Sequence, residues 1–427
     1  MKTLSYEEKV EILKSLLKRL NKGESVEKLR EEFRDVLASV SPVEIPFIEQ
    51  ELVREGVPVR EILRMCDMHA ELFYEALKSR EIKGVPKGHP LDLLMKENEE
   101  IVKLAEKLSL YSTVLAERGD GVSLDELSEM LRRLSVSLRR HYVKNQMLLF
   151  PYLERLGIAA VPRVLWGRED QVLGRIRKLS ASLGDGAGSI AVKLREVSRE
   201  VADLVFRENK ILYPTLWALL EEEDWAAVAL EADKIGYIVE VEGEWRPRAK
   251  PRYPFQLKPT TLEEKLEKLP PEVRRLAKGG EPDDYEVARE GDVELGTGFL
   301  SPAELSGLFR GLPLEITFAG RDDRVRFFSS SMLMEGFIRT KTILGRRIEY
   351  CHPPRLEGLV KSTVEKLKRG EKDFEVFWTR IRGRTVRVLI SAVRSNDGEY
   401  LGVLEIVEDF TDILENPEEV KKSVVVL

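Results

Sequence analysis

The stretch LRRHYVKNQMLLFPYLE, residues 138–154, decides how the middle of the chain folds. Its apolar residues recur at helical spacing, which predicts an amphipathic helix over about residues 124–152. His141 lies in the middle of this helix, with Asn145 one turn further on and Gln146 beside it. We therefore ask which residues the neighbouring helices place opposite this histidine.

Three more long helical stretches flank this one, at about residues 90–116, 161–183 and 187–221. The four are separated by short breaks at Arg118-Gly119-Asp120-Gly121, Gly157 and Gly184-Asp185-Gly186-Ala187-Gly188. Four amphipathic helices with short connections favour an antiparallel up-and-down bundle. We therefore predict a four-helix bundle at residues 83–240.

The chain before the bundle is predicted to be a small helical domain, residues 1–82. Its first helix carries one apolar stripe, formed by Val10, Leu13, Leu16, Leu17 and Leu20. Further helices are predicted from Ser41 to Gly56 and from about Val59 to Ser79. Cys66 and His69 lie three residues apart on the last of these, but two such residues do not make a metal site.

The chain after the bundle contains two segments with different sequence patterns. Residues 241–297 are rich in proline and charge, which predicts a linker wrapping a surface, with one short helix at 261–268. After Leu300 the pattern becomes that of strands, in LEITFAG, RVRFFSS, FEVFWTRI, TVRVLISAVR and YLGVLEIVEDF. Helices are expected after the second strand, at about 354–369. Residues 298–415 are therefore predicted to form an α+β domain with a five-stranded antiparallel sheet, in a chain that is otherwise mostly α.

Composition excludes several classes of protein. The 427 residues carry a formal net charge of −6, so no basic face for nucleic acid is expected. The two cysteines, Cys66 and Cys351, lie in different predicted domains, which favours a reducing compartment over a disulfide framework. The N-terminal segment MKTLSYEEKVEILKSLL has no apolar core of the signal-peptide kind, and no apolar stretch of about 18 residues occurs, so we expect a cytoplasmic protein without a membrane span. The chain also lacks a phosphate-binding loop and a nucleophile elbow, and we predict no enzyme activity.

Histidines and carboxylates are spaced so that they converge inside the predicted bundle. His89 precedes Pro90 at the entrance of the first helix, with Glu97 two turns further along the same face. The other three helices offer His141, Glu169 and Glu208. Inward-facing imidazoles and carboxylates are the ligands of di-iron and di-manganese sites.

Several segments resemble known families. HPLDLLMKEN (89–98), HYVKNQMLLFPYLERLGI (141–158), WGRED (166–170) and FRENKILYP (206–214) resemble the hemerythrin-like, HHE cation-binding domain. SVSPVEIPFIEQELVREGVPVREILRMCDMHAELF (39–73) resembles the helical domain of unknown function, family 438, that commonly precedes it. GLPLEITFAGRDDRVRFFSSS, ILGRRIEYCHPP and SNDGEYLGVLEIVEDF resemble the PAS domain. Together these resemblances cover nearly all of the chain except the predicted linker.

The bundle departs from the hemerythrin-like pattern at several ligand positions. Asp92 and Glu169 stand where that pattern has histidines. Asn145 and Gln146 stand where it has a glutamate, while Glu208 is retained.

These departures allow two interpretations of the bundle. In one, Asp92 and Glu169 join His89, Glu97, His141 and Glu208 in an oxygen-rich site for iron or manganese. In the other, the loss of ligands has left a scaffold without metal, because neutral amides compensate the charge of a metal pair poorly. We favour the second interpretation, with no cofactor in the bundle.

The resemblance to a PAS domain implies a cavity that can hold haem, flavin or another small ligand, and it implies a homodimer. The candidates to line the cavity are Phe327, Cys351, His352 and Trp378. A structural explanation stands beside this one, since two prolines after His352 fix a turn and aromatic residues in strands usually pack in a core.

The sequence therefore predicts a cytosolic sensor or adaptor protein. Its PAS-like domain would bind a small ligand or a partner and would be coupled to a bundle with a degenerate metal site and to an unknown downstream protein. Two alternatives stay open: a di-iron or manganese protein that handles oxygen, nitric oxide or iron, and a structural scaffold without any ligand.

Overall fold

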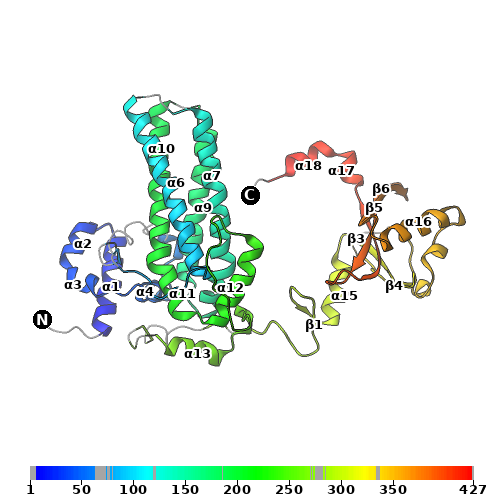
Figure 1. Ribbon diagram of the computed structural model, residues 1–427, viewed down its shortest axis with the longest axis horizontal. Coiled ribbons are helices and arrows are strands. Elements are labelled where there is room, and N and C mark those ends of the chain that lie inside the picture. Colours follow the sequence, from blue (N-terminus) through cyan, green and yellow to red (C-terminus); the bar gives the residue numbers. More distant parts are fainter. Residues whose placement is uncertain are drawn as a thin grey trace. The chain divides into compact units, whose positions relative to one another are not determined.

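The structure is a computed structural model. It describes residues 6–62, 74, 77–78, 80–118, 122–184, 186–269, 271, 273–274, 282–283, 285–332 and 337–425. The chain divides into two compact units, residues 1–285 and 286–427, the first helical and the second built on a β-sheet (Figure 1). Cys66 and His69 lie outside the described residues. Among the described helices, none has the length and apolar character that crossing a membrane requires.

The predicted four-helix bundle forms the centre of the first unit. Its helices are α6 (Pro90–Arg118), α7 (Leu124–Lys144), α9 (Ala160–Ala181) and α10 (Ala187–Arg207). Both α6 and α9 pack against α7 and α10. Each helix buries one apolar stripe, which in α7 includes Leu127, Leu131, Leu134 and Leu138.

A π-helical turn interrupts two of the predicted helices. The first, η1 (Asn145–Leu149), leads from α7 into α8 (Phe150–Arg155), and the second, η2 (Glu208–Leu212), leads from α10 into α11 (Tyr213–Leu219). Pro151 and Pro214 are the second residues of α8 and α11. Because proline has no amide hydrogen and its ring clashes with the preceding turn, the regular hydrogen-bond ladder cannot continue there. Such π turns are frequent at functional sites, and these two hold Asn145 and Glu208 at equivalent positions.

The N-terminal helices pack onto the bundle within the same unit. They are α1 (Tyr6–Asn21), α2 (Val26–Glu32), α3 (Arg34–Ala38) and α4 (Glu44–Arg54). Phe47 of α4 belongs to the hydrophobic core of the bundle, and Val164 of α9 belongs to the core of the N-terminal helices. The side-chain oxygen of Gln50 also accepts hydrogen bonds from the Ala159 and Ala160 amides, at 3.0 and 2.9 Å. The start of α9 is therefore capped by a residue of the N-terminal domain.

The segment predicted to be a linker contributes to the core of the bundle. Residues 236–285, which follow α12 (Glu222–Ile235), are here called the strap; its described residues include η3 (Pro254–Gln256) and α13 (Pro259–Glu267). Leu257, Leu262 and Leu269 of the strap are buried in the core of the bundle. The Arg155 guanidinium of α8 donates to the Leu257 carbonyl at 2.7 Å. The strap therefore completes the first unit.

The second unit contains the predicted five-stranded antiparallel sheet. Its strands are β3 (Leu314–Gly320), β4 (Val325–Phe328), β5 (Phe374–Ile381), β6 (Arg384–Arg394) and β7 (Tyr400–Asp409), in the order β4-β3-β7-β6-β5. Helix α16 (Glu357–Lys368) covers one face, where Val364 and Leu367 pack with Ala319 and Val403. The fold class predicted from the sequence is thus confirmed.

Smaller elements surround this sheet. The prediction did not include β1 (Val293–Glu294), β2 (Phe299–Leu300), α15 (Pro302–Gly311), α17 (Thr411–Glu415) and α18 (Pro417–Ser423). Between β4 and α16 lie the short turns η4 (Lys341–Ile343), η5 (Ile348–Cys351) and η6 (Pro354–Leu356). Strands β1 and β2 pair with each other in a separate two-stranded sheet.

Candidate functional site

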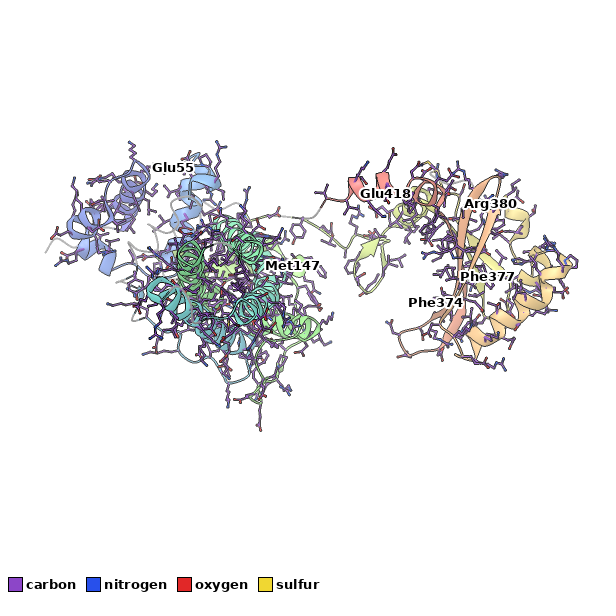
Figure 2. The ribbon with its side chains drawn as sticks, turned by 90° about the horizontal axis from the view of Figure 1, so that it is seen from above. Glu55, Met147, Phe374, Phe377, Arg380 and Glu418 are labelled. Carbon is purple, nitrogen blue, oxygen red and sulfur yellow. The ribbon has the colours of Figure 1, made fainter. Side chains whose placement is uncertain are left out.

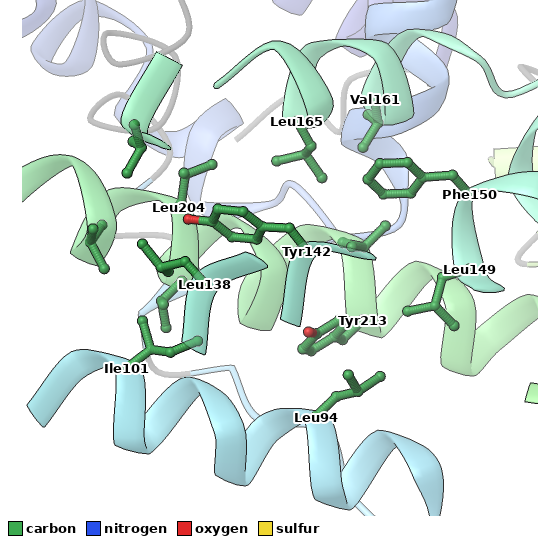
Figure 3. Close-up of a cluster of buried hydrophobic side chains, with 14 of the residues drawn as sticks. Leu94, Ile101, Leu138, Tyr142, Leu149, Phe150, Val161, Leu165, Leu204 and Tyr213 are labelled. Atoms are coloured by element: carbon green, nitrogen blue, oxygen red, sulfur yellow. The ribbon is translucent and has the colours of Figure 1, made fainter. Parts of the chain in front are cut away.

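A cluster of ionisable side chains lies inside the apolar core of the bundle. Glu97 of α6, His141 of α7, Glu169 of α9 and Glu208 of η2 are all inaccessible to solvent. Apolar residues from the same helices surround them, and Tyr142 and Tyr213 stand among these (Figure 3). Since burying a charge is costly unless it is paired, the contacts within this cluster decide its chemistry.

His141 is held between two carboxylates. Its Nδ1 lies 2.7 Å from Glu97 Oε2, and its Nε2 lies 2.8 Å from Glu208 Oε2. Burial alone lowers the pKa of His141, but Glu208 and Glu97 outweigh this and raise it to about 9. His141 is therefore an imidazolium at neutral pH and donates both of its N–H groups.

Lys144, one turn after His141, pairs with the other oxygen of Glu97. Its Nζ lies 2.9 Å from Glu97 Oε1 and donates to the Gly236 carbonyl at 2.8 Å. Burial raises the pKa of Glu97, but the hydrogen bonds and charges of His141 and Lys144 together outweigh it, so that the pKa lies below its ordinary value. The Ile238 amide also donates to Glu97 Oε1, at 2.8 Å. Two cations thus balance two carboxylates in the core.

Glu169 differs from the other two carboxylates. Burial, with the nearby charge of Glu208, raises the pKa of Glu169 to about 8, so its neutral form prevails at pH 7. The Gln146 side-chain amide donates to Glu169 Oε2 at 2.7 Å. Glu169 therefore lies in the cluster without adding a charge to it.

Three oxygens in and beside the cluster have no hydrogen-bond partner among the described residues: Glu169 Oε1, Glu208 Oε1 and the Tyr142 hydroxyl. The Tyr213 hydroxyl lies 3.2 Å from His141 Nε2 and 3.3 Å from Glu208 Oε2. The Tyr213 hydroxyl thus lies within hydrogen-bond distance of both His141 and Glu208, on the side of the cluster that faces Glu208.

His89 and Asp92 form no hydrogen bond or ion pair with this cluster among the described residues. The His89 ring contacts the rings of Trp217, Trp225 and Trp245, with centroids 5.3, 4.8 and 4.6 Å away. Its Nδ1 accepts the Leu91 amide hydrogen at 3.1 Å, and burial lowers the pKa of His89 to about 4. Asp92 accepts from the Gly88 amide at 2.8 Å and pairs with Lys96. Both residues are thus engaged locally at the start of α6, and the expected convergence holds for four of the six residues.

These residues do not fit a dinuclear metal centre. Such a centre in a bundle takes glutamates from two helices and a glutamate–histidine pair from each of the other two. The cluster has one imidazole, whose two nitrogens both face carboxylates, and the Lys144 ammonium occupies the side of Glu97. Within the described ranges, no three His, Cys, Asp or Glu residues are placed to hold a metal ion.

Sequence reasoning missed Lys144, Tyr213 and the strap as parts of the site. Lys144 had a signal, because a lysine three residues after His141 shares the buried face of a helix. The contribution of Gly236 and Ile238 had none, since both act through backbone groups and come from a segment with no regular pattern.

The residues predicted to line a cavity of the PAS-like domain do not share one environment. Phe327 packs against Phe309 of α15, with ring centroids 4.8 Å apart. The His352 Nδ1 bonds with the Ile348 carbonyl at 2.8 Å, and Cys351 is exposed. The expectation that Trp378 lines the interior is wrong, because its side chain is 54% exposed.

The exposure of Trp378 follows from the alternation of β5. Phe374, Val376 and Trp378 point to one face of this edge strand and are 58%, 36% and 54% exposed. Phe377 points to the other face and packs with Val388 and Val407; Figure 2 labels Phe374 and Phe377 on this strand. The sheet therefore carries an apolar stripe on its open edge.

Three family models match the chain. They are "Family of unknown function (DUF438)" over residues 13–79, "Hemerythrin HHE cation binding domain" over residues 89–216 and "PAS domain" over residues 305–411. The family resemblances seen in the sequence are thus confirmed for all three segments.

Solved structures similar to parts of the chain come from three bacteria. A C-terminal domain from Streptococcus mutans is 34% identical, with 29% of this chain and 96% of that chain covered and a TM-score of 0.27. A PAS domain from Colwellia psychrerythraea is 11% identical (26% and 97% covered, TM-score 0.22). A sensory box sensor histidine kinase from Vibrio cholerae is 16% identical (25% and 90% covered, TM-score 0.20). No curated protein matched the chain.

Proposed function

We propose that this chain, which carries a DUF438 domain, a hemerythrin HHE cation binding domain and a PAS domain in that order, is a cytoplasmic sensor or adaptor protein without enzyme activity. A small ligand or a protein partner binds the PAS domain, and the helical unit transmits or receives the resulting change. The joint presence of hemerythrin and PAS domains supports a sensor role.

One observation carries the assignment of the bundle. The His141 imidazolium lies between Glu97 and Glu208 and supplies positive charge where a metal ion would otherwise supply it. With Lys144 on the far side of Glu97, the core is electrically balanced by its own side chains. The bundle then acts as a scaffold whose degenerate metal site has become an ion-pair network.

The apolar stripe of β5 supports a homodimer through the PAS domain. Phe374, Val376 and Trp378 lie on one face of an edge strand, where exposed apolar area marks an interaction site. A second copy of the same strand would cover this stripe with equivalent residues, as two-fold dimers do.

A second candidate function is a metal protein that handles oxygen, nitric oxide or iron. The unpaired, buried oxygens of Glu208 and Tyr142 favour it, since such atoms call for a partner. It requires His141 to give up at least one carboxylate and to present that ring nitrogen to a metal.

Metal content per chain, measured by plasma emission spectrometry on protein purified without a His-tag, separates the two candidates. An ultraviolet–visible spectrum of the same sample reports any coloured ligand of the PAS domain. We expect trace metal only, even after incubation with ferrous or manganous salt. About two metal ions per chain, lost in His141→Ala, would overturn the scaffold assignment in favour of the metal protein.

A further inference from the structure

The first ten residues of the strap, residues 236–245, touch both the buried ion-pair network and the entrance of α6. We infer that this segment, here called the latch, couples the arrangement of the buried ion-pair network to the entrance of α6. The inference deepens the proposed function, on which its signalling use rests, but the latch itself is defined by contacts within the first unit.

At its beginning, the latch bonds directly to the network through its main chain. The Gly236 carbonyl accepts from Lys144 Nζ at 2.8 Å, and the Ile238 amide donates to Glu97 Oε1 at 2.8 Å. Between them, the Tyr237 ring lies 5.1 Å from Lys144 Nζ. Glu97 also pairs with His141 at 2.7 Å. The latch is therefore bonded to a residue that directly contacts His141, the centre of the network.

At its end, the latch closes on the residues before α6. A Cβ atom on Gly243 would lie 2.4 Å from the Lys87 carbonyl oxygen, and the φ of Gly243 is +118°. The main chains therefore approach so closely that this position needs glycine. The Trp245 ring then packs on His89, with centroids 4.6 Å apart.

The rest of the strap is anchored separately, so the latch can move without it. The Arg252 guanidinium donates to Asp224 Oδ1 at 2.9 Å and to Glu221 Oε2 at 2.7 Å. Leu257 and Leu262 follow, buried in the core of the bundle. The latch is thus a short stretch between two fixed points, α12 and Arg252.

A change in the ion-pair network must affect the latch, and a change in the latch must affect the network. If Glu97 turns away or Lys144 loses its contact, Gly236 and Ile238 lose their partners and the latch opens. By the same linkage, displacing the latch from Lys87 and His89 at the entrance of α6 withdraws hydrogen bonds from Glu97 and Lys144.

Hydrogen exchange measured by mass spectrometry on the full chain tests the latch. Lys144→Met removes the bonds to Gly236 and Glu97 but keeps the length of the buried side chain. We expect the amides of residues 236–245 to exchange at least tenfold faster in this variant, and those of residues 257–269 to be unchanged. Glu169→Gln, in the same cluster but without contact with the latch, is the matched control and leaves both segments unchanged.

A second variant perturbs the latch at its other end, where Gly243 lies against Lys87. Gly243→Ala changes no residue of the network and is expected to give the same tenfold loss of protection, including at the Ile238 amide. If Lys144→Met loses its helical circular dichroism signal and has therefore failed to fold, Gly243→Ala alone tests the latch. Unchanged exchange of the latch in the folded variants, or equal loosening by Glu169→Gln, would overturn the inference. Metal content and PAS ligands do not enter this measurement, so its failure is distinct from a failure of the proposed function.

Discussion

His141 keeps its charge in the core because a carboxylate faces each of its ring nitrogens. Removing it leaves Glu97 and Glu208 buried without that partner. We expect His141→Leu to lower the free energy of unfolding by about 3–5 kcal/mol, measured by urea denaturation. The triple variant Glu97→Gln, His141→Leu, Glu208→Gln is the control and should regain most of the loss. Equal stability of the single variant and the wild type would contradict the ion-pair network.

The two buried histidines make opposite contributions to the pH dependence of stability. The pKa of His141 is raised from 6.5 to about 9, so the stability it adds is complete below pH 6.5 and is lost as the pH rises through 9. The pKa of His89 is lowered to about 4, so its contribution is present above pH 6.5 and is lost as the pH falls through 4. For His141 the change is of the order of 3 kcal/mol.

Urea titrations between pH 4 and pH 9.5 check these signs. The free energy of unfolding is expected to fall between pH 6.5 and pH 9.5, because His141 loses its proton and the buried Glu169, with a pKa of about 8, becomes charged. His141→Leu should make this alkaline fall shallower, and His89→Leu should reduce the loss of stability on the acid side. A wild-type stability that rises steadily from pH 6.5 to pH 9 would show that His141 is neutral in the core.

The candidate site could be predicted from the sequence in part. Helical spacing placed Glu97, His141, Glu169 and Glu208 in one core, because a buried face repeats every three or four residues. The environment of His89 could not be predicted in this way. Its ring packs on tryptophans 128, 136 and 156 residues further along the chain, and Trp245 belongs to a segment without periodicity.

At the scale of elements, β5 carries the exposed stripe that supports a PAS homodimer. We expect Trp378→Glu to shift the chain from dimer to monomer in analytical ultracentrifugation, because a charge replaces an apolar contact at the interface. Trp166→Glu is the matched control, since Trp166 is similarly exposed, at 43%, on the helical unit. Dimers that persist in Trp378→Glu would place the interface elsewhere.

The Gln50 cap joins the N-terminal helices to the bundle at the start of α9. Gln50→Ala removes the acceptor of two amide hydrogens that have no place in the hydrogen-bond ladder of the helix. The expected cost is about 1–2 kcal/mol in the free energy of unfolding of the first unit, by analogy with other helix caps. Gln171→Ala, on the exposed side of the same helix, should cost less than about 0.5 kcal/mol.

At the scale of the whole molecule, the fold of each unit was predictable because its elements have clear periods. Strand alternation placed all five strands of the sheet, and the Asn396-Asp397-Gly398 turn separated the last two. The strap was predicted to be a linker because prolines and charges dominate it. Its isolated leucines enter a core built by other elements, and such burial leaves no local pattern.

The strap can be tested by truncation. A fragment of residues 1–285 is expected to unfold cooperatively, with the helical content of the first unit. A fragment of residues 1–240 lacks Leu257, Leu262 and Leu269, each of which fills the core of the bundle. Since an emptied leucine site costs about 2–5 kcal/mol, the shorter fragment should be severely destabilised or unfolded in thermal melts followed by circular dichroism. Equal melting temperatures would contradict a structural role for the strap.

The position of these leucines also affects how the protein folds during its synthesis on the ribosome. The four helices of the bundle are synthesised first, and the leucines that close its core follow about 50–60 residues after Arg207. At about 5–20 residues per second, the nascent bundle exposes an uncovered apolar surface for roughly 3–12 seconds. During that interval the growing chain is a natural client for chaperones that hold exposed apolar segments, even though the finished unit buries them.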